Sequence, residues 1–108
     1  MKATAKQKKD EFARGDLILA AAQDRWRGAN ITRPKLNIYS VSYEGKYAGS
    51  FSWRLGDDGM GSIKWKPSSE FIDIAPRRPD FVYNYVDEIS DVDAMYVWAS
   101  PIFNDILA

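Results

Sequence analysis

The stretch that decides the fold reads KYAGSFSWRL and spans residues 46–55. Its odd positions, from Tyr47 to Leu55, are apolar apart from one glycine, whereas its even positions are polar or small. This period-two alternation is typical of a strand with one buried and one solvated face. It resumes over residues 62–66, where Ile63 and Trp65 take the odd positions. The two segments therefore predict adjacent antiparallel strands whose odd-numbered side chains face a helical layer.

The sequence before this pair of strands predicts a third one. Residues 36–43 are rich in β-branched and aromatic residues, and Glu44-Gly45 is a plausible tight turn into the strand that follows. Residues 30–35 contain Pro34 and predict a connector. A meander of three antiparallel strands is expected from residue 36 to residue 66.

The sequence after residue 66 fits more than one pattern. Residues 67–75 fit a short helix, although part of this segment fits an extended chain equally well. Residues 81–85 alternate as a strand would, but a helical face also fits residues 82–96. The enrichment in valine and tyrosine favours strands at residues 81–85 and 94–98. Ser100-Pro101 has the chemistry of a helix start, which predicts a terminal helix ending at Ala108.

The N-terminal segment, residues 4–28, predicts one kinked helix or two short ones. Thr4 and Gln7 form a capping-box pattern, Gly15 can close a first helix, and Asp16 can cap a second. One helical face is expected to enter the core, and it carries Phe12, Leu19, Ala22 and Trp26. The prediction is thus a single α+β domain over residues 1–108. An N-terminal helical segment packs on an antiparallel sheet of about four or five strands, and a short C-terminal helix follows.

The composition leaves few routes to catalysis. The chain of 108 residues has no cysteine and no histidine, which removes thiol nucleophiles, thiolate metal sites and the commonest general base. Asp57 and Asp58 lie among glycines in the 56–61 stretch, as in an ordinary hairpin loop. We therefore expect no catalytic residues, no metal site and no cofactor. The polar N-terminus and the lack of a long apolar run predict a cytoplasmic protein that does not enter a membrane.

The formal net charge of zero conceals an asymmetry along the chain. Residues 1–35 hold nine basic and four acidic side chains, whereas residues 67–108 hold two basic and eight acidic ones. Such asymmetry bears on partners and association rates, although the two ends could also neutralise each other in the folded chain.

The acidic last third predicts a protein-binding surface. Tyrosine and tryptophan supply rigid contact area, and neighbouring carboxylates would steer the surface toward a basic partner. The function expected first is therefore a non-enzymatic module that binds and blocks a host protein with a basic surface. The same aromatic residues would serve equally well as core. The candidate residues are Tyr83, Tyr85, Asp87, Glu88, Asp91, Asp93 and Trp98.

The alternative is a single-stranded nucleic-acid-binding protein. The polar face of the predicted strands carries four cations that could pair with phosphates, and Tyr39, Tyr43 and Tyr47 lie nearby in the sequence. Trp53 and Trp65 fall on the opposite, apolar face and are expected to be buried. The candidate residues of this alternative are Lys46, Arg54, Lys64 and Lys66.

The end of the chain resembles a short motif of one known family. Trp98-Ala99-Ser100 followed by residues 105–108 is similar to the closing motif of the small phage Thoeris anti-defence proteins. The similarity covers eleven residues, and the Asp-Trp ending of that motif is missing, so the chain is not assigned to the family. More broadly, a short aromatic-rich chain without cysteine or histidine resembles phage accessory proteins that inhibit host machinery. The oligomeric state is left open by the sequence.

Overall fold

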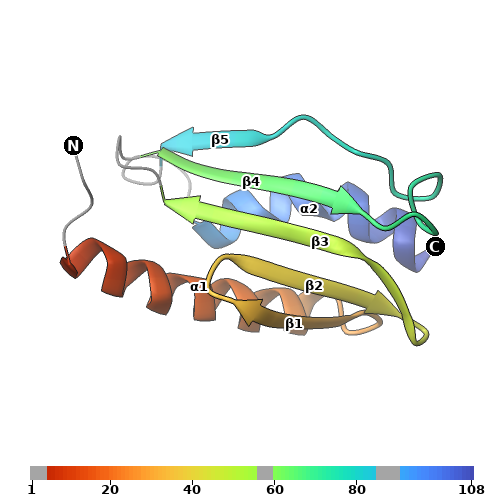
Figure 1. Cartoon of the computed structure of the whole chain (residues 1–108), viewed down its shortest axis with the longest axis horizontal. Coiled ribbons are helices and arrows are strands. Elements are labelled where there is room, and N and C mark those ends of the chain that lie inside the picture. Colours follow the sequence, from red (N-terminus) through yellow and green to blue (C-terminus); the bar gives the residue numbers. More distant parts are fainter. Residues whose placement is uncertain (1–4, 56–59, 85–90) are drawn as a thin grey trace.

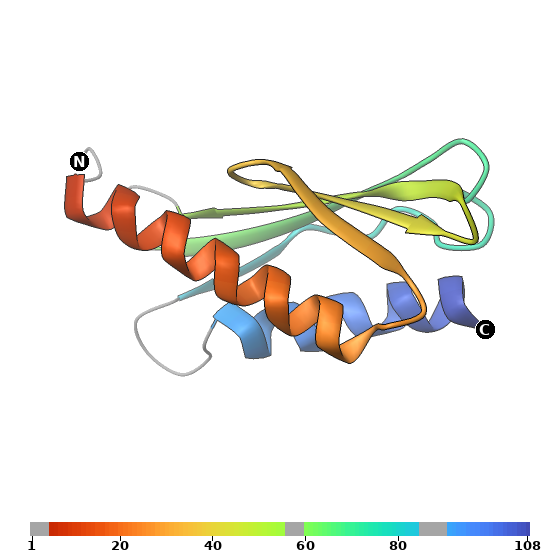
Figure 2. The same ribbon diagram turned by 90° about the horizontal axis from the view of Figure 1, so that it is seen from below.

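Both helices lie on the same face of a five-stranded antiparallel sheet, so the molecule has two layers (Figures 1 and 2). The structure is a computed structural model, and it describes residues 5–55, 60–84 and 91–108. Helix α1 spans Ala5–Arg25 and helix α2 spans Asp91–Leu107. The predicted α+β class, with an N-terminal helix, a small antiparallel sheet and a C-terminal helix, is confirmed.

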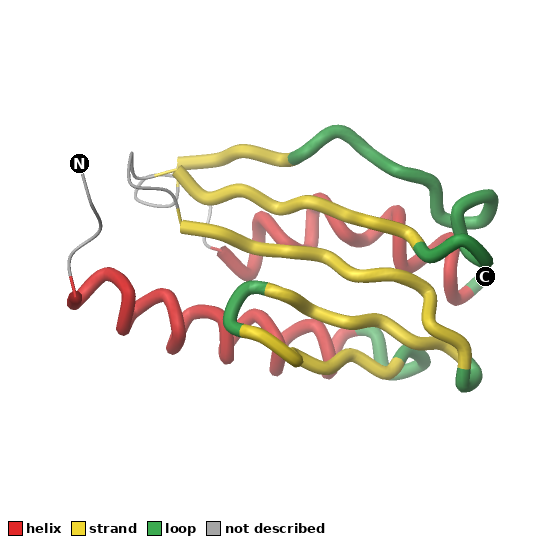
Figure 3. The backbone as a smooth tube through the Cα atoms, in the orientation of Figure 1, coloured by secondary structure: helices red, strands yellow, loops and turns green. Residues whose placement is uncertain are grey.

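The strands follow one another across the sheet in chain order, as a meander (Figure 3). Each strand pairs antiparallel with the next. Their bounds are Asn30–Lys35 for β1, Ile38–Tyr43 for β2, Lys46–Leu55 for β3, Met60–Pro67 for β4 and Phe81–Asn84 for β5.

Strand β1 replaces the connector that was predicted for residues 30–35. Ile31 pairs with Val41, and both side chains are buried in the core. The pairing becomes irregular between Thr32 and Lys35, on either side of Pro34. Because proline cannot donate a backbone hydrogen bond, it is tolerated here at the edge of the sheet.

The predicted register of β3 and β4 is confirmed. Phe51 pairs with Trp65 and Trp53 pairs with Ile63, and all four side chains are at most 3% exposed. The even-numbered positions of the same strands point to the opposite face, where Arg54 and two lysines are exposed.

A β-bulge at Gly49 ends this alternation near the start of β3. The register between β2 and β3 shifts there, and both Ala48 and Gly49 are buried. Gly49 has a φ of +151°, and a Cβ at this position would lie 2.6 Å from the carbonyl oxygen of Lys66. Only glycine fits such a backbone. Tyr47 consequently pairs with Ser42 on the helix-free face and is 50% exposed, so its predicted core position is wrong.

Helix α1 runs through Gly15 without a break, so of the two predicted alternatives the single helix is the one observed. The guanidinium of Arg33 lies against Gly15, and a Cβ there would approach its Nη2 to 2.1 Å. Arg33 donates hydrogen bonds to the carbonyl oxygens of Leu36 and Phe12, and its Nη1 pairs with Asp16. The glycine therefore provides room for a docked arginine between α1 and β1.

The buried face of α1 differs from the predicted one, because Ile18 is fully buried on it and Phe12 is not. Ala22 and Trp26 are buried as expected, and Trp26 stacks on Phe103 of α2 with 4.1 Å between ring centroids. Phe12, however, is 56% exposed, with the Arg33 guanidinium over its ring, so its assignment to the core is wrong. Leu19 is partly buried.

Helix α2 includes the predicted C-terminal helix but begins earlier, so the strand predicted at residues 94–98 is wrong. It continues through Pro101. The carbonyl that loses its hydrogen-bond donor belongs to Val97, a residue that is 67% exposed, which suits the loss of that bond. The buried side chains recur every three or four residues, which is the spacing of a helical face. They are Ala94, Met95, Trp98, Ala99, Ile102, Phe103 and Ile106.

The helix expected at residues 67–75 is a series of turns. Phe71 and Ala75 are buried, and the backbone N–H of Ala75 donates to the carbonyl of Phe71. The indole Nε1 of Trp65 donates to the carbonyl of Ala75 at 3.0 Å, which holds this segment against β4.

None of the helices in the described residues is both long and apolar enough to cross a membrane.

Candidate nucleic-acid interface

The helix-free face of the sheet is mainly polar. Its side chains form rows, because residues paired directly across antiparallel strands point to the same side. Neither described helix covers this face (Figure 2), and no position in three of these rows is a carboxylate. The rows are Thr32, Ser40, Ser50 and Lys66; then Lys35, Ile38, Ser52 and Lys64; then Arg54, Ser62 and Val82.

Cations concentrate on β3, β4 and the loop that precedes β5. Arg54, Lys64 and Lys66 are exposed on the sheet, and Arg77 and Arg78 are exposed in the loop. Among the described residues, only Lys64 of this group forms an ion pair, with Asp80, where Nζ lies 3.5 Å from Oδ2. The molecule has a formal net charge of zero, yet this surface carries a local positive charge.

Two shallow clefts are formed by these side chains. One, of about 410 Å³, includes Ser52, Arg54, Ser62 and Lys64 among its lining residues. The other, of about 370 Å³, lies between β4 and the loop and is lined in part by Lys66, Arg77 and Arg78. Lys64 and Asp80 line both clefts, which are therefore neighbours.

Among the residues that the structure describes, one exposed aromatic ring accompanies the cations on this face. Tyr47 is half exposed and lines a further cleft of about 400 Å³ together with Ser68 and Glu70. The bulge that turns Tyr47 outward also changes the face of Lys46. Lys46 pairs with Tyr43 and so does not share the face of Tyr47. Of the four predicted cations, the structure thus places three on one face and leaves Lys46 at the hairpin end of β3.

The residues predicted for protein binding are distributed differently. Tyr83 and Asp91 are buried, at 5% and 7% exposure, and Trp98 is buried at 8% with its Nε1 donating to the carbonyl of Pro79. Asp93 is exposed on α2. Tyr85, Asp87 and Glu88 lie outside the described residues. Tyr83, Asp91 and Trp98 hence contribute to the interior and offer little surface to a partner.

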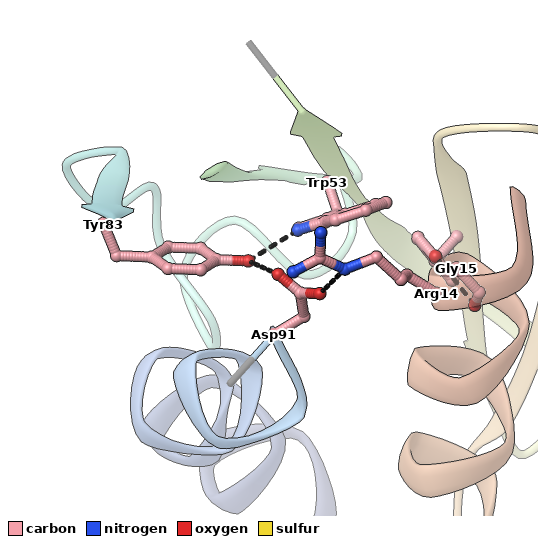
Figure 4. A network of polar contacts seen from close by, with 6 residues as sticks. Arg14, Gly15, Trp53, Tyr83 and Asp91 are labelled. Carbon is pink, nitrogen blue, oxygen red and sulfur yellow. Dashed lines mark hydrogen bonds and ion pairs between the residues drawn. The ribbon is translucent and has the colours of Figure 1, made fainter. Parts of the chain in front are cut away.

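Tyr83 and Asp91 belong to a chain of buried polar contacts (Figure 4). Trp53 Nε1 donates to the Tyr83 hydroxyl at 2.6 Å, and this hydroxyl donates to Oδ1 of Asp91 at 2.6 Å. Arg14 Nε donates to the other carboxylate oxygen of Asp91, forming an ion pair. The contacts join β3, β5, α2 and α1.

The environment of Tyr83 favours its neutral form. Burial raises the pKa of this phenol far above its ordinary value, and the hydrogen bond to the Asp91 carboxylate raises it further. The hydroxyl therefore remains a donor, as the buried carboxylate requires. Gly61 makes room for the ring, since a Cβ there would lie 2.5 Å from it.

The sequence reasoning missed Arg77 and Arg78 as part of the basic surface. They are remote in sequence from β3, and only the return of the chain to pair β5 with β4 brings them beside Lys64 and Lys66. The signal was the pair of arginines between Pro76 and Pro79. Two prolines restrict the backbone of such a loop and fix what it displays.

The described residues contain no group of three or more histidine, cysteine, aspartate or glutamate side chains that could hold a metal ion. No protein-family model, no curated protein and no solved structure matches the chain.

Proposed function

We propose that the protein is a non-catalytic binding module of the cytoplasm whose helix-free sheet face binds single-stranded nucleic acid. The observation that carries the proposal is the set of exposed cations, Arg54, Lys64 and Lys66, on a face whose other described positions are mainly serines. Phosphate groups bind cations and hydroxyl donors, and they account for most of the affinity of non-specific complexes.

The shape of the face favours a single strand over a duplex. An open sheet lets an extended strand lie across its rows, with phosphates on the cations and a base on an exposed ring. Tyr47 is the exposed aromatic ring available on this side. The small serine side chains at positions such as Ser50 and Ser52 leave the surface shallow enough for close approach of the backbone.

The test is binding of fluorescein-labelled single-stranded oligonucleotides, followed by fluorescence anisotropy. Lys64→Glu with Lys66→Glu should abolish binding, because the phosphates would then face two carboxylates. Arg25→Glu with Arg27→Glu changes the net charge equally at exposed positions at the end of α1, in the layer opposite this face, and should weaken binding only slightly. Equal losses in the two double variants would contradict the proposal, as would a wild-type protein that binds no oligonucleotide.

A second candidate is the blocking of a basic host protein, as an inhibitor encoded by a phage or another mobile element would do. It is supported by Asp93, which is exposed at the start of α2, and by Val97, which is 67% exposed one turn later. A carboxylate beside an exposed apolar side chain suits a protein contact. Tyr85, Asp87 and Glu88 remain part of this proposal.

Affinity capture from host lysate separates the two candidates. Under the blocking function, a discrete partner should survive nuclease treatment and be lost on Asp93→Lys but not on Asp105→Lys, which is also exposed on α2. Capture that disappears with nuclease would instead support nucleic-acid binding.

A further inference from the structure

The two basic clefts on the helix-free face share a boundary made by Lys64 and Asp80. Both residues line both clefts, and their side chains are 64% and 47% exposed. One cleft lies over β3 and β4, and the other lies between β4 and the loop before β5. A ligand that extends from one cleft into the other must pass this ion pair.

The first cleft has an alternating arrangement of cations and hydroxyls. Arg54 of β3 pairs with Ser62 of β4, and Ser52 of β3 pairs with Lys64 of β4. The two cations are thus diagonal to each other, and so are the two hydroxyls. Directly paired side chains start about 5 Å apart, and positions two residues apart along a strand start about 6.6 Å apart. Four donors around a rectangle of this size can converge on one phosphate group, whose oxygens accept charge-assisted hydrogen bonds.

The second cleft offers cations from two separate segments. Lys66 comes from β4, whereas Arg77 and Arg78 come from the loop between Pro76 and Pro79. The arginines are exposed, and they form no ion pair with another described residue. This arrangement suits a second phosphate of the same chain.

Asp80 places a carboxylate between these two groups of cations. Its Oδ2 lies 3.5 Å from Nζ of Lys64, which reduces the positive charge that Lys64 presents to a ligand. A phosphate in either cleft would also be repelled by this carboxylate, because Asp80 lines both.

We propose that the two clefts are adjacent phosphate-binding subsites for one nucleic-acid backbone, and that Asp80 between them limits the affinity. This inference rests on the proposed nucleic-acid function and adds where the phosphates bind and which residue opposes them.

The experiment measures binding of fluorescein-labelled dT12 as a function of salt. Each phosphate contact with a single strand contributes about 0.7 to the slope of log K against log salt concentration. Arg54→Gln should lower the slope by about 0.7, and Arg77→Gln with Arg78→Gln should lower it by about 0.7 to 1.4. Arg27→Gln, at an exposed position just after α1 in the layer opposite this face, is the control and should leave the slope unchanged.

Asp80→Asn should tighten binding by about fivefold at low salt, because one unit charge near the phosphates is removed. Unchanged slopes in both arginine variants, or weaker binding by Asp80→Asn, would overturn the two-subsite assignment even if the wild-type protein binds dT12.

A second probe, inorganic tripolyphosphate, separates this inference from the proposed function. In NMR titrations it should shift the amide signals of Ser52, Lys64 and Arg78 and leave those of α2 in place. Such shifts without any binding of dT12 would refute the nucleic-acid function and retain the phosphate subsites. Binding of dT12 without these shifts would refute the subsites alone.

Discussion

The hydroxyl of Tyr83 donates a 2.6 Å hydrogen bond to Oδ1 of Asp91, and this contact connects the last strand of the sheet to the first residue of α2. Trp53 donates to the same hydroxyl from β3, while Arg14 on α1 pairs with the carboxylate. A buried carboxylate is tolerated only when it is paired and hydrogen-bonded. This network of polar contacts thus fixes the position of both helices against the sheet.

Tyr83→Phe should destabilise the protein by about 1–3 kcal/mol, since it leaves the buried Trp53 indole N–H without an acceptor and removes one donor from Asp91. Urea unfolding followed by circular dichroism measures the loss. Tyr96→Phe is the matched control, because its hydroxyl makes a longer, 3.4 Å hydrogen bond to the carbonyl of Ala21 in a half-buried position. Equal losses of stability in the two variants would show that the network of polar contacts around Tyr83 makes no special contribution to stability.

Alkaline pH should destabilise the wild type more than Tyr83→Phe. The pKa of Tyr83 is raised in the folded protein above the ordinary value of 10.0, so its contribution is fully present below pH 10 and declines as the unfolded chain loses the proton. The difference between the two proteins should narrow above pH 10, by at most about 1.4 kcal/mol per pH unit. Parallel stability curves from pH 9 to 11 would contradict the raised pKa.

Gly49→Ala should destabilise the fold by about 2–4 kcal/mol, because the new Cβ meets the backbone of β4, where nothing can move aside. Gly45→Ala is the control. Gly45 also has a positive φ, of 78°, but nothing lies within 4 Å of its Cβ position, so the cost should be only about 1 kcal/mol. Thermal unfolding of both variants measures the difference, and a larger loss at Gly45 would argue against the bulge.

The effect of Gly15→Ala on the free energy of unfolding should change sign when Arg33 is replaced. In the wild type the new methyl group displaces the Arg33 guanidinium and disrupts its hydrogen bonds, for a loss of about 1–2 kcal/mol. In an Arg33→Ala background the same substitution should stabilise α1 by about 1 kcal/mol, since alanine favours a helix over glycine. A double-mutant cycle by urea unfolding measures the coupling. Stabilisation in both backgrounds would show that Arg33 does not dock on Gly15.

The sheet was predictable where the alternation of apolar and polar residues matches the alternation of buried and exposed side chains. In β3 and β4 the apolar residues around Trp53 and Trp65 are the buried ones. The failure at Tyr47 has a local cause, because one bulge at Gly49 reverses the face of every residue before it. Nothing in the composition of that segment distinguishes a bulged glycine from an ordinary one.

In α2 the spacing of the buried residues outweighs the strand preference of the individual residues. Valine and tyrosine around Tyr96 favour a strand, but Ala94, Trp98 and Ile102 recur at helical intervals and form the buried face. Pro101 has the chemistry of a helix start, yet α2 passes through it, and the residue whose carbonyl loses its donor, Val97, is exposed.

The candidate site was predictable only in its sheet portion. Lys64 and Lys66 follow from the register of β4, whereas Arg77 and Asp80 join them through pairing between segments distant in sequence. The burial of Asp91 likewise depends on partners from three other elements. Such long-range contacts leave no periodic signal in the sequence.

Pro34 and Lys35 at the end of β1 also affect how copies of the protein meet. An outer strand with a continuous row of unpaired N–H and C=O groups invites a second chain to extend the sheet, which is the first step toward fibrils. Pro34 removes one donor from that row, the irregular pairing beside it distorts the strand, and the exposed Lys35 would face the same charge on an incoming copy. The residues that make β1 difficult to recognise as a strand therefore protect the protein against aggregation.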